Sequence, residues 1–252
     1  MKKIILLLFI FSATVSVQAQ VFKNVIKSVT KKDSSGSSTA GKIFQKTTTG
    51  SGALTNDEII NGLREALSVG AQNAAAQLSK TDGFFKDAII KILMPAEAKK
   101  VESTLRNLGM GKQVDNAILS MNRAAEDASK KAVPIFVNAI KSMSITDGLS
   151  ILKGGNLAAT NFLKEKTTAA LTEAFTPVIE ASLKKVDATK YWAAVFTTYN
   201  KFSREKVDTD LLSYVTGKAI DGMFYGIGKE EEKIRKDPMA RTTELLKKVF
   251  GK

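Results

Sequence analysis

The sequence predicts an all-α fold: a single multi-helix globular domain that follows a cleaved signal peptide and a flexible basic linker. From Leu54 onward the apolar residues recur at spacings of three and four, and no stretch alternates convincingly with period two. Residues that start and stop helices, such as Asp, Thr, Pro and Gly, divide this pattern into successive segments. The range 54–252 contains no second linker, which is typical of one domain.

The first segment, residues 1–19, predicts export. A basic start precedes an apolar run at Ile4–Phe11, and a small-residue pattern ends at Ala19, where we expect cleavage. The apolar run is too short to cross a bilayer, and no later segment reaches the roughly 18 to 20 apolar residues that a membrane helix needs. We therefore expect a periplasmic protein that is not transmembrane.

Residues 20–53 form a predicted flexible tail that is rich in Ser, Thr, Gly and Lys. Six Lys against one Asp give this tail a charge of +5, within a formal net charge of +13 for the whole sequence. Such a tail favours anionic surfaces, so we expect either weak peripheral membrane contact through residues 21–46 or a tail that stays free. Nucleic acid is not an expected partner, because the basic residues are mixed with acidic ones and lack interleaved aromatic residues.

The start and stop residues predict where each helix lies. The sequence Thr55-Asn56-Asp57-Glu58 begins the first helix, which continues to Leu78. The second helix is capped by Asp82 and ends at Met94-Pro95, the third runs from Pro95 to Gly109, and the fourth contains residues 121–132. One helix follows Pro134, a short one begins at Thr146-Asp147, and a long one covers 157–185 with a kink at Pro177. The remaining helices are one marked by Trp192 and Phe196, one marked by Leu212 and Met223, and a last one from Asp237-Pro238 to Gly251.

The apolar faces of these helices predict the core. Its expected members are Leu105, Ile118, Met121, Phe136, Phe162, Phe175, Trp192, Phe196, Val215, Phe224, Leu246 and Val249. Within the helix marked by Leu212 and Met223, Gly222 and Gly226 lie four residues apart. We expect a neighbouring helix to approach closely at that face, because a glycine in a helix interior costs about 1 kcal/mol relative to alanine.

Two absences from the composition narrow the possible chemistry. The chain has no Cys and no His, so it cannot form a disulfide, an ordinary zinc site or a Ser-His or Cys-His nucleophile pair. An enzyme built from this sequence would depend on carboxylates, lysines or hydroxyls. We predict no catalytic, metal-ligating or cofactor-binding residue, and no cofactor.

The stretch MNRAAEDASKKA, residues 121–132, contains the most distinctive polar residues. On a helical wheel Arg123 and Glu126 lie off the apolar stripe, so they form either a solvated face or a buried polar cluster. The C-terminal stretch EEEKIRKDPMAR offers complementary charges, and we expect Arg123 to reach Glu231 or Glu232 while Glu126 reaches Arg235 or Arg241. The predicted cluster consists of Asn122, Arg123, Glu126, Glu231, Glu232, Arg235 and Arg241.

The stretch LKGGNLAATN, residues 152–161, predicts a helix stop followed by a new helix start that Asn156 caps. Its glycines could also hold an anion at that helix N-terminus. A turn between two helices is the simpler interpretation.

Five stretches in order resemble one known bacterial exported family. They read LREALSVGAQNAAAQLSKTDGFF, MNRAAEDA, LKGGNLAATNFLKEKT, YVTGKAIDGMF and EEEKIRKDPMARTTELLKKVFG. Together they resemble domain of unknown function 4197 over roughly residues 54–251. The resemblance implies no activity, substrate or cofactor. The sequence departs from the family pattern at 91–95, KILMP, which lacks the first of two expected prolines.

These observations favour a non-enzymatic binding or interaction module in the cell envelope, with an envelope protein or an anionic envelope component as its partner. The alternative is a carboxylate-dependent hydrolase or lyase that acts on an envelope polymer. A pocket of roughly 300 Å³ or more with convergent Arg123, Glu126 and Arg241 would favour ligand binding or catalysis. A filled interior with an exposed apolar patch would favour a protein partner.

Overall fold

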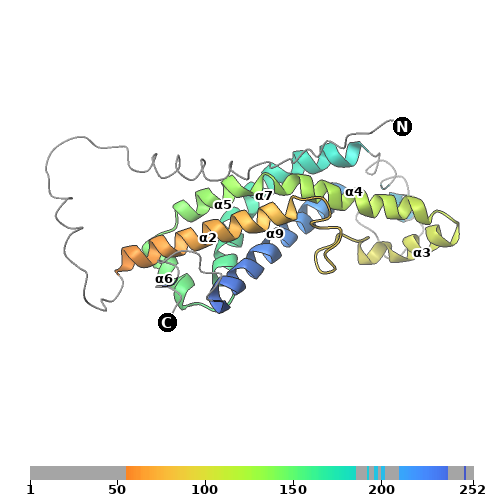
Figure 1. Ribbon diagram of the computed structural model, residues 1–252. Helices are drawn as coiled ribbons and strands as arrows, with labels where there is room; N and C mark the ends of the chain where they lie inside the picture. Colours follow the sequence, from red (N-terminus) through yellow and green to blue (C-terminus); the bar gives the residue numbers. More distant parts are fainter. Residues whose placement is uncertain are drawn as a thin grey trace, which may run out of the picture. The chain divides into compact units, whose positions relative to one another are not determined.

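The computed structural model describes residues 55–185 and 210–237, together with Trp192, Phe196, Thr197, Asn200, Lys201 and Lys247. These residues form helices and turns, and no strand occurs among them, which confirms the predicted all-α fold (Figure 1). The helices are α2 (Asn56–Leu78), the 3-10 helix η2 (Ala96–Ala98), α3 (Lys99–Asn107), α4 (Gly111–Ser129), α5 (Ala132–Lys141), α6 (Ile145–Lys153), α7 (Ala158–Lys184) and α9 (Leu211–Lys236). The signal peptide, the tail and the helix expected after Asp237 lie outside the described residues.

Local capping explains where several helices begin. Thr55 and Glu58 form a reciprocal capping box at the start of α2, in which each side chain accepts from the other residue's backbone N–H. Ser144 and Asp147 form a second capping box at the start of α6. The left-handed backbone of Gly109, with φ of 79°, ends the turn after α3. The start of α2 and the stop at Gly109 agree with the sequence prediction, whereas α6 begins at Ile145, one residue before the expected start, and Ser144 is its cap residue.

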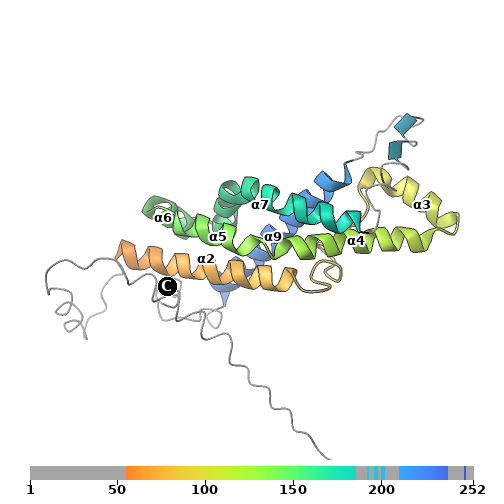
Figure 2. The same cartoon turned by 90° about the horizontal axis from the view of Figure 1, so that it is seen from above.

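The helices pack in rows around one core. Seen from above, the consecutive helices α5 and α4 lie between α2 and α7 (Figure 2). Helix α9 crosses this arrangement and contacts α2, α4 and α7, and α3 contacts α4 beyond the end of α2 (Figures 1 and 2). The arrangement leaves α3 with no buried residue of its own.

The predicted core residues are largely found inside. The buried ones are Ile118, Met121, Phe136, Phe175, Trp192, Phe196, Val215 and Phe224. Leu105 and Phe162 are partly buried against this core. Leu246 and Val249 lie outside the described residues.

Segment 79–95 corrects the prediction of a second helix. Consecutive turns replace that helix, and Asp82 adopts a left-handed backbone with φ of 69°, which an N-terminal cap does not. The expected apolar face does not form, since Ile92 is buried while Ile89 is 70% exposed. Gly83 explains the tight turn: a Cβ there would lie 2.6 Å from the carbonyl oxygen of Gln77.

The close approach of a neighbouring helix is confirmed at Gly226, which meets α2, whereas at Gly222 the neighbour is Phe84 in the turn after α2. A Cβ at Gly222 would lie 2.9 Å from Cζ of Phe84, and one at Gly226 would lie 2.9 Å from Cδ1 of Leu78. The two glycines therefore let α9 approach the end of α2 and the turn that follows it. This contact compensates for the low helix propensity of glycine.

In the part of the chain that the structure describes, no single helix combines the length and the apolar character needed to cross a bilayer. Helices α5 and α6 meet that requirement only when taken together across a bend of 105°.

Candidate functional site

The polar residues predicted to form one cluster separate into two sets of contacts. The first set lies on α4. The carboxylate of Glu126, only 3% exposed, accepts from the backbone N–H groups of Phe84 (3.1 Å) and Phe85 (3.3 Å). Arg123 donates to Glu126 (2.6 Å) and to Asp82 (2.6 Å). Glu126 therefore satisfies two N–H groups of the irregular segment, and Arg123 balances its charge.

The third member of this set, Asn122, is fully buried. Its side-chain oxygen accepts from the N–H of Ile92 (2.9 Å), and its amide nitrogen donates to the carbonyl of Ile92 (2.8 Å) and to that of Ile118 (2.7 Å). Segment 79–95 has no regular hydrogen-bond ladder, so α4 provides partners for its buried backbone groups. This explains why a helix with an apolar stripe carries Asn122 and Glu126 in buried positions.

Asp82 lies between two cations at the edge of this set. Hydrogen bonds from Lys86, and then from Arg123, hold the pKa of Asp82 below its usual value of 3.8. The hydrogen bond with Asp82 in turn raises the pKa of Arg123. Both groups are therefore charged at neutral pH, and the arrangement is a salt-bridged anchor for the turn.

The second set joins α9 to the beginning of α7. Glu231, 6% exposed, accepts from the backbone N–H groups of Ala159 (3.1 Å) and Thr160 (2.9 Å) and from the hydroxyl of Thr160 (2.8 Å). Arg235 donates to Glu231 (2.9 Å) and to the carbonyl of Ile151 (2.9 Å). Glu231 thus caps the N-terminus of α7, where negative charge is favoured.

This contact corrects the expectation for residues 152–161. The cap residue of α7 is Leu157, which makes no side-chain cap, and Asn156 is exposed. The carboxylate of Glu231 occupies the anion-binding end of the helix instead.

The predicted contacts between the two sets are wrong. Arg123 pairs with Glu126 and Asp82 and not with Glu231 or Glu232. Glu232 pairs with Lys236 (2.7 Å) and Lys229 (3.5 Å) on the surface of α9. The physical reason is that segment 79–95, rather than the C-terminal segment, docks on this face of α4. Arg241 lies outside the described residues.

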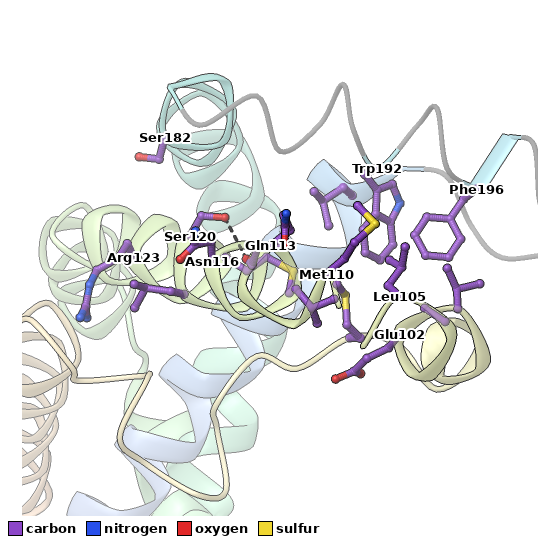
Figure 3. A pocket seen from close by; sticks show the side chains of 18 of the residues that line it. Glu102, Leu105, Met110, Gln113, Asn116, Ser120, Arg123, Ser182, Trp192 and Phe196 are labelled. Atoms are coloured by element: carbon purple, nitrogen blue, oxygen red, sulfur yellow. Dashed lines mark hydrogen bonds between the residues drawn. The ribbon is translucent and has the colours of Figure 1, made fainter. Parts of the chain in front are cut away.

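A pocket of about 820 Å³ lies beside α3 and α4 (Figure 3). The end of α7, Trp192, Phe196 and the start of α9 complete its walls. Its apolar lining consists of Met94, Ala98, Val101, Leu105, Met110, Val114, Ala117, Leu119, Met121, Trp192, Phe196 and Leu211. Its polar lining consists of Glu102, Gln113, Asn116, Ser120, Arg123, Asp127, Ser182 and Lys185.

The large apolar side chains gather at one end of the pocket, with Glu102 beside them, and the other labelled polar side chains lie along the rest of its length (Figure 3). Leu105, Met110, Trp192 and Phe196 lie together, whereas Arg123 and Ser182 lie at the opposite end (Figure 3). The rings of Trp192 and Phe196 pack with their centroids 4.3 Å apart.

Sequence reasoning did not find this pocket. It assigned Leu105, Met121, Trp192 and Phe196 to the core, where the structure places them, but it did not show that these side chains also line a pocket. One signal was available: Val101, Leu105 and Leu108 give the short α3 an apolar stripe, which needs a partner surface. Leu108 remains 70% exposed. Helix α3 therefore covers the pocket but is not itself buried in the core.

Most charged groups of the lining already have partners. Glu102 pairs with Arg106 (2.9 Å), and Asp127 pairs with Lys130 (2.8 Å). The hydroxyl of Ser120 donates to the carbonyl of Ala117 at 2.8 Å (Figure 3). Among the described residues, no group of three or more His, Cys, Asp or Glu is arranged to hold a metal ion.

Comparison with known proteins identifies one family. Its description reads "Protein of unknown function (DUF4197)", and its model matches residues 53–251. No curated protein and no solved structure matches the chain.

Proposed function

The chain belongs to this family of proteins of unknown function, and from that premise we propose that it is an exported, non-enzymatic binding module of the cell envelope. Its ligand enters the pocket beside α3 and α4. The N-terminal signal pattern supports export. The observation that carries the binding proposal is the pocket itself, because about 820 Å³ with a mainly apolar lining and a few polar groups is typical of small-molecule sites.

The carboxylates of the lining favour binding over hydrolysis. Glu102 and Asp127 each form an ion pair with a basic residue. Glu126, the most buried carboxylate on α4, is engaged by two backbone N–H groups and Arg123. A general acid or base must reach the substrate with a free carboxyl oxygen, and these three carboxylates are already engaged by basic side chains or backbone N–H groups.

The test uses Trp192, which is the only tryptophan of the chain and lines the pocket. The mature full-length protein is titrated with N-phenyl-1-naphthylamine, a neutral apolar fluorophore. We expect saturable enhancement of its emission and energy transfer from Trp192, because bound dye would lie within the same pocket.

Two variants locate the binding. Leu105→Glu places a charge in the apolar end of the pocket and should weaken dye binding at least tenfold. Ile145→Glu, which changes an exposed apolar residue of α6 outside the pocket, is the matched control. Equal binding by both variants, with both folded by circular dichroism, would show that the dye binds elsewhere and would refute the proposal.

The basic tail has a separate role in the proposal. Residues 21–46 lie outside the described residues, and their charge of +5 supports weak contact with anionic membrane. Sedimentation with phosphatidylglycerol vesicles should recover the native protein at low salt and release it at high salt. Replacement of the six tail lysines by serine should abolish this binding, and unchanged sedimentation of that variant would contradict the tail's role.

A further inference from the structure

The pocket beside α3 and α4 also indicates what kind of ligand it takes. We propose that the ligand is an anionic single-chain amphiphile, such as a long-chain carboxylate, whose hydrocarbon chain lies between α3 and α4 and whose head group lies at Lys185. This inference rests on the proposed function, that the pocket binds a ligand.

The interior of the pocket suits hydrocarbon. Of the described residues that line the pocket, twelve are apolar, among them Leu105, Trp192 and Phe196. The hydroxyl of Ser120 is already engaged by its own helix. A peptide or sugar group placed against this apolar part of the lining would lose its bonds to water without replacing them, which costs free energy. A hydrocarbon chain carries no such groups.

The shape of the lining side chains favours a flexible chain. Three methionines, Met94, Met110 and Met121, contribute to the walls. Methionine is unbranched and adapts its shape to what it contacts. Trp192 and Phe196 add two flat surfaces at the apolar end (Figure 3). Such walls can accommodate acyl chains that differ in length and in curvature. A rigid ligand would need a fixed complementary surface instead.

The charged residues of the lining favour an anion. Among the described residues, four charged ones line the pocket, and three of them, Glu102, Arg123 and Asp127, form ion pairs with other side chains. Lys185 follows the last turn of α7 and is exposed, and none of the ion pairs among the described residues involves it. Among the described charged residues of the lining, the ammonium group of Lys185 is therefore the one available for a ligand head group.

Asp127 on α4 is a lining carboxylate that contacts the end of α7. It accepts from the hydroxyl of Ser182 at 3.5 Å, three residues before Lys185. Lys130, at 2.8 Å, balances its charge. Among the described residues, an anionic head group at Lys185 would thus meet a cation that forms no ion pair, while the negative charge of Asp127 is balanced by Lys130.

The first experiment measures affinity against chain length. Dissociation constants for dodecanoate, tetradecanoate and 1-tetradecanol are determined with the mature full-length protein, below the critical micelle concentrations, from Trp192 fluorescence and by calorimetry. We expect binding to tighten roughly fourfold for each added methylene, which corresponds to about 0.8 kcal/mol. A dissociation constant that does not depend on chain length would overturn the inference.

The second experiment tests the head group. Lys185→Gln should weaken tetradecanoate binding by up to about fivefold, as expected for an exposed ion pair, and leave 1-tetradecanol binding unchanged. Lys184→Gln is the matched control, because Lys184 is the adjacent exposed lysine, pairs with Glu180 (2.6 Å) and does not line the pocket.

The outcomes separate this inference from the proposed function. Equal binding of the alcohol and the carboxylate, both insensitive to Lys185→Gln, overturns the anionic head group while the pocket remains a binding site. Displacement of N-phenyl-1-naphthylamine by an amphipathic helical peptide, but by neither tetradecyl compound, overturns the amphiphile in favour of a protein partner. If neither dye nor amphiphile binds, both proposals fail.

Discussion

Asn122 on α4 forms hydrogen bonds with both backbone groups of Ile92, accepting from the N–H at 2.9 Å and donating to the carbonyl at 2.8 Å. This is the pairing that a neighbouring strand would provide, and here a single side chain provides it. Together with Glu126, which accepts from Phe84 and Phe85, it fixes the course of segment 79–95 on α4. That segment leads directly into η2 and α3, and therefore into the wall of the pocket.

Asn122→Ala should destabilise the protein, because it leaves two buried backbone groups of Ile92 without partners. Unsatisfied buried groups cost about 1–3 kcal/mol each, so we expect a loss of roughly 2–4 kcal/mol and a fall in Tm of about 5–15 °C. Thermal unfolding followed by circular dichroism measures this change. Asn116→Ala, at an exposed position of the same helix, should change Tm very little, and similar effects of the two substitutions would contradict the role of Asn122.

Substitution of two glycines of α9 by alanine should change the free energy of unfolding in opposite directions. Gly222→Ala places a methyl group against the ring of Phe84 and should destabilise by about 1–3 kcal/mol through overpacking. Gly217→Ala has open space around the new methyl group and should stabilise by about 0.5–1 kcal/mol through helix propensity. Urea unfolding measures both changes. Stabilisation by both substitutions would show that α9 does not approach Phe84 closely.

Glu231 and Glu232 differ in burial although they are neighbours. Glu231→Gln removes the charge that caps α7 and leaves Arg235, whose side chain is 14% exposed, without its partner carboxylate. Breaking such a buried pair costs about 3–5 kcal/mol. Glu232→Gln breaks only the surface pairs with Lys229 and Lys236 and should cost less than about 1 kcal/mol. Calorimetric Tm values of the two variants that agree within error would refute the structural role of Glu231.

Stability should fall in acid partly through Asp210, the cap residue of α9. Hydrogen bonds from the side chain and then the backbone N–H of Ser213 lower the pKa of Asp210 from 3.8. A carboxyl group with a lower pKa in the folded state binds fewer protons than in the unfolded state. Its contribution to stability is therefore complete above about pH 4 and is lost as the pH falls through the folded-state pKa.

Asp210→Asn retains a capping side chain but cannot titrate, so its stability should depend less on pH below about 4 than that of the native protein. Urea unfolding between pH 7 and pH 2.5 provides the comparison. Ser213→Ala removes the hydroxyl that donates to Asp210 at 2.6 Å and should also reduce the slope. Identical slopes for the native protein and both variants would mean that Asp210 does not contribute to acid unfolding.

Local features of the chain determined most of its helices. Thr55 and Glu58 are three residues apart, and their capping box starts α2 as the sequence predicts. The same holds for the turn at Gly109 and for the apolar spacing that places Phe136 and Phe175 in the core. The lack of Cys and His likewise follows from the sequence alone. Each of these depends on residues within about one helical turn, or on composition, so no knowledge of the tertiary structure is needed.

The tertiary structure alone decided which segments meet. Asp82 and Arg123 are 41 residues apart, and Thr160 and Glu231 are 71 residues apart. The helical wheel identified Arg123 and Glu126 as unusual, but it contains no information about which distant segment reaches them. The turns of 79–95 were missed for the same reason, because Asn122 and Glu126 supply the hydrogen bonds that a helix would have made internally. The pocket arises where α3 leaves α4, α7 and α9 incompletely covered, and such a space is a property of packed helices rather than of any one stretch of sequence.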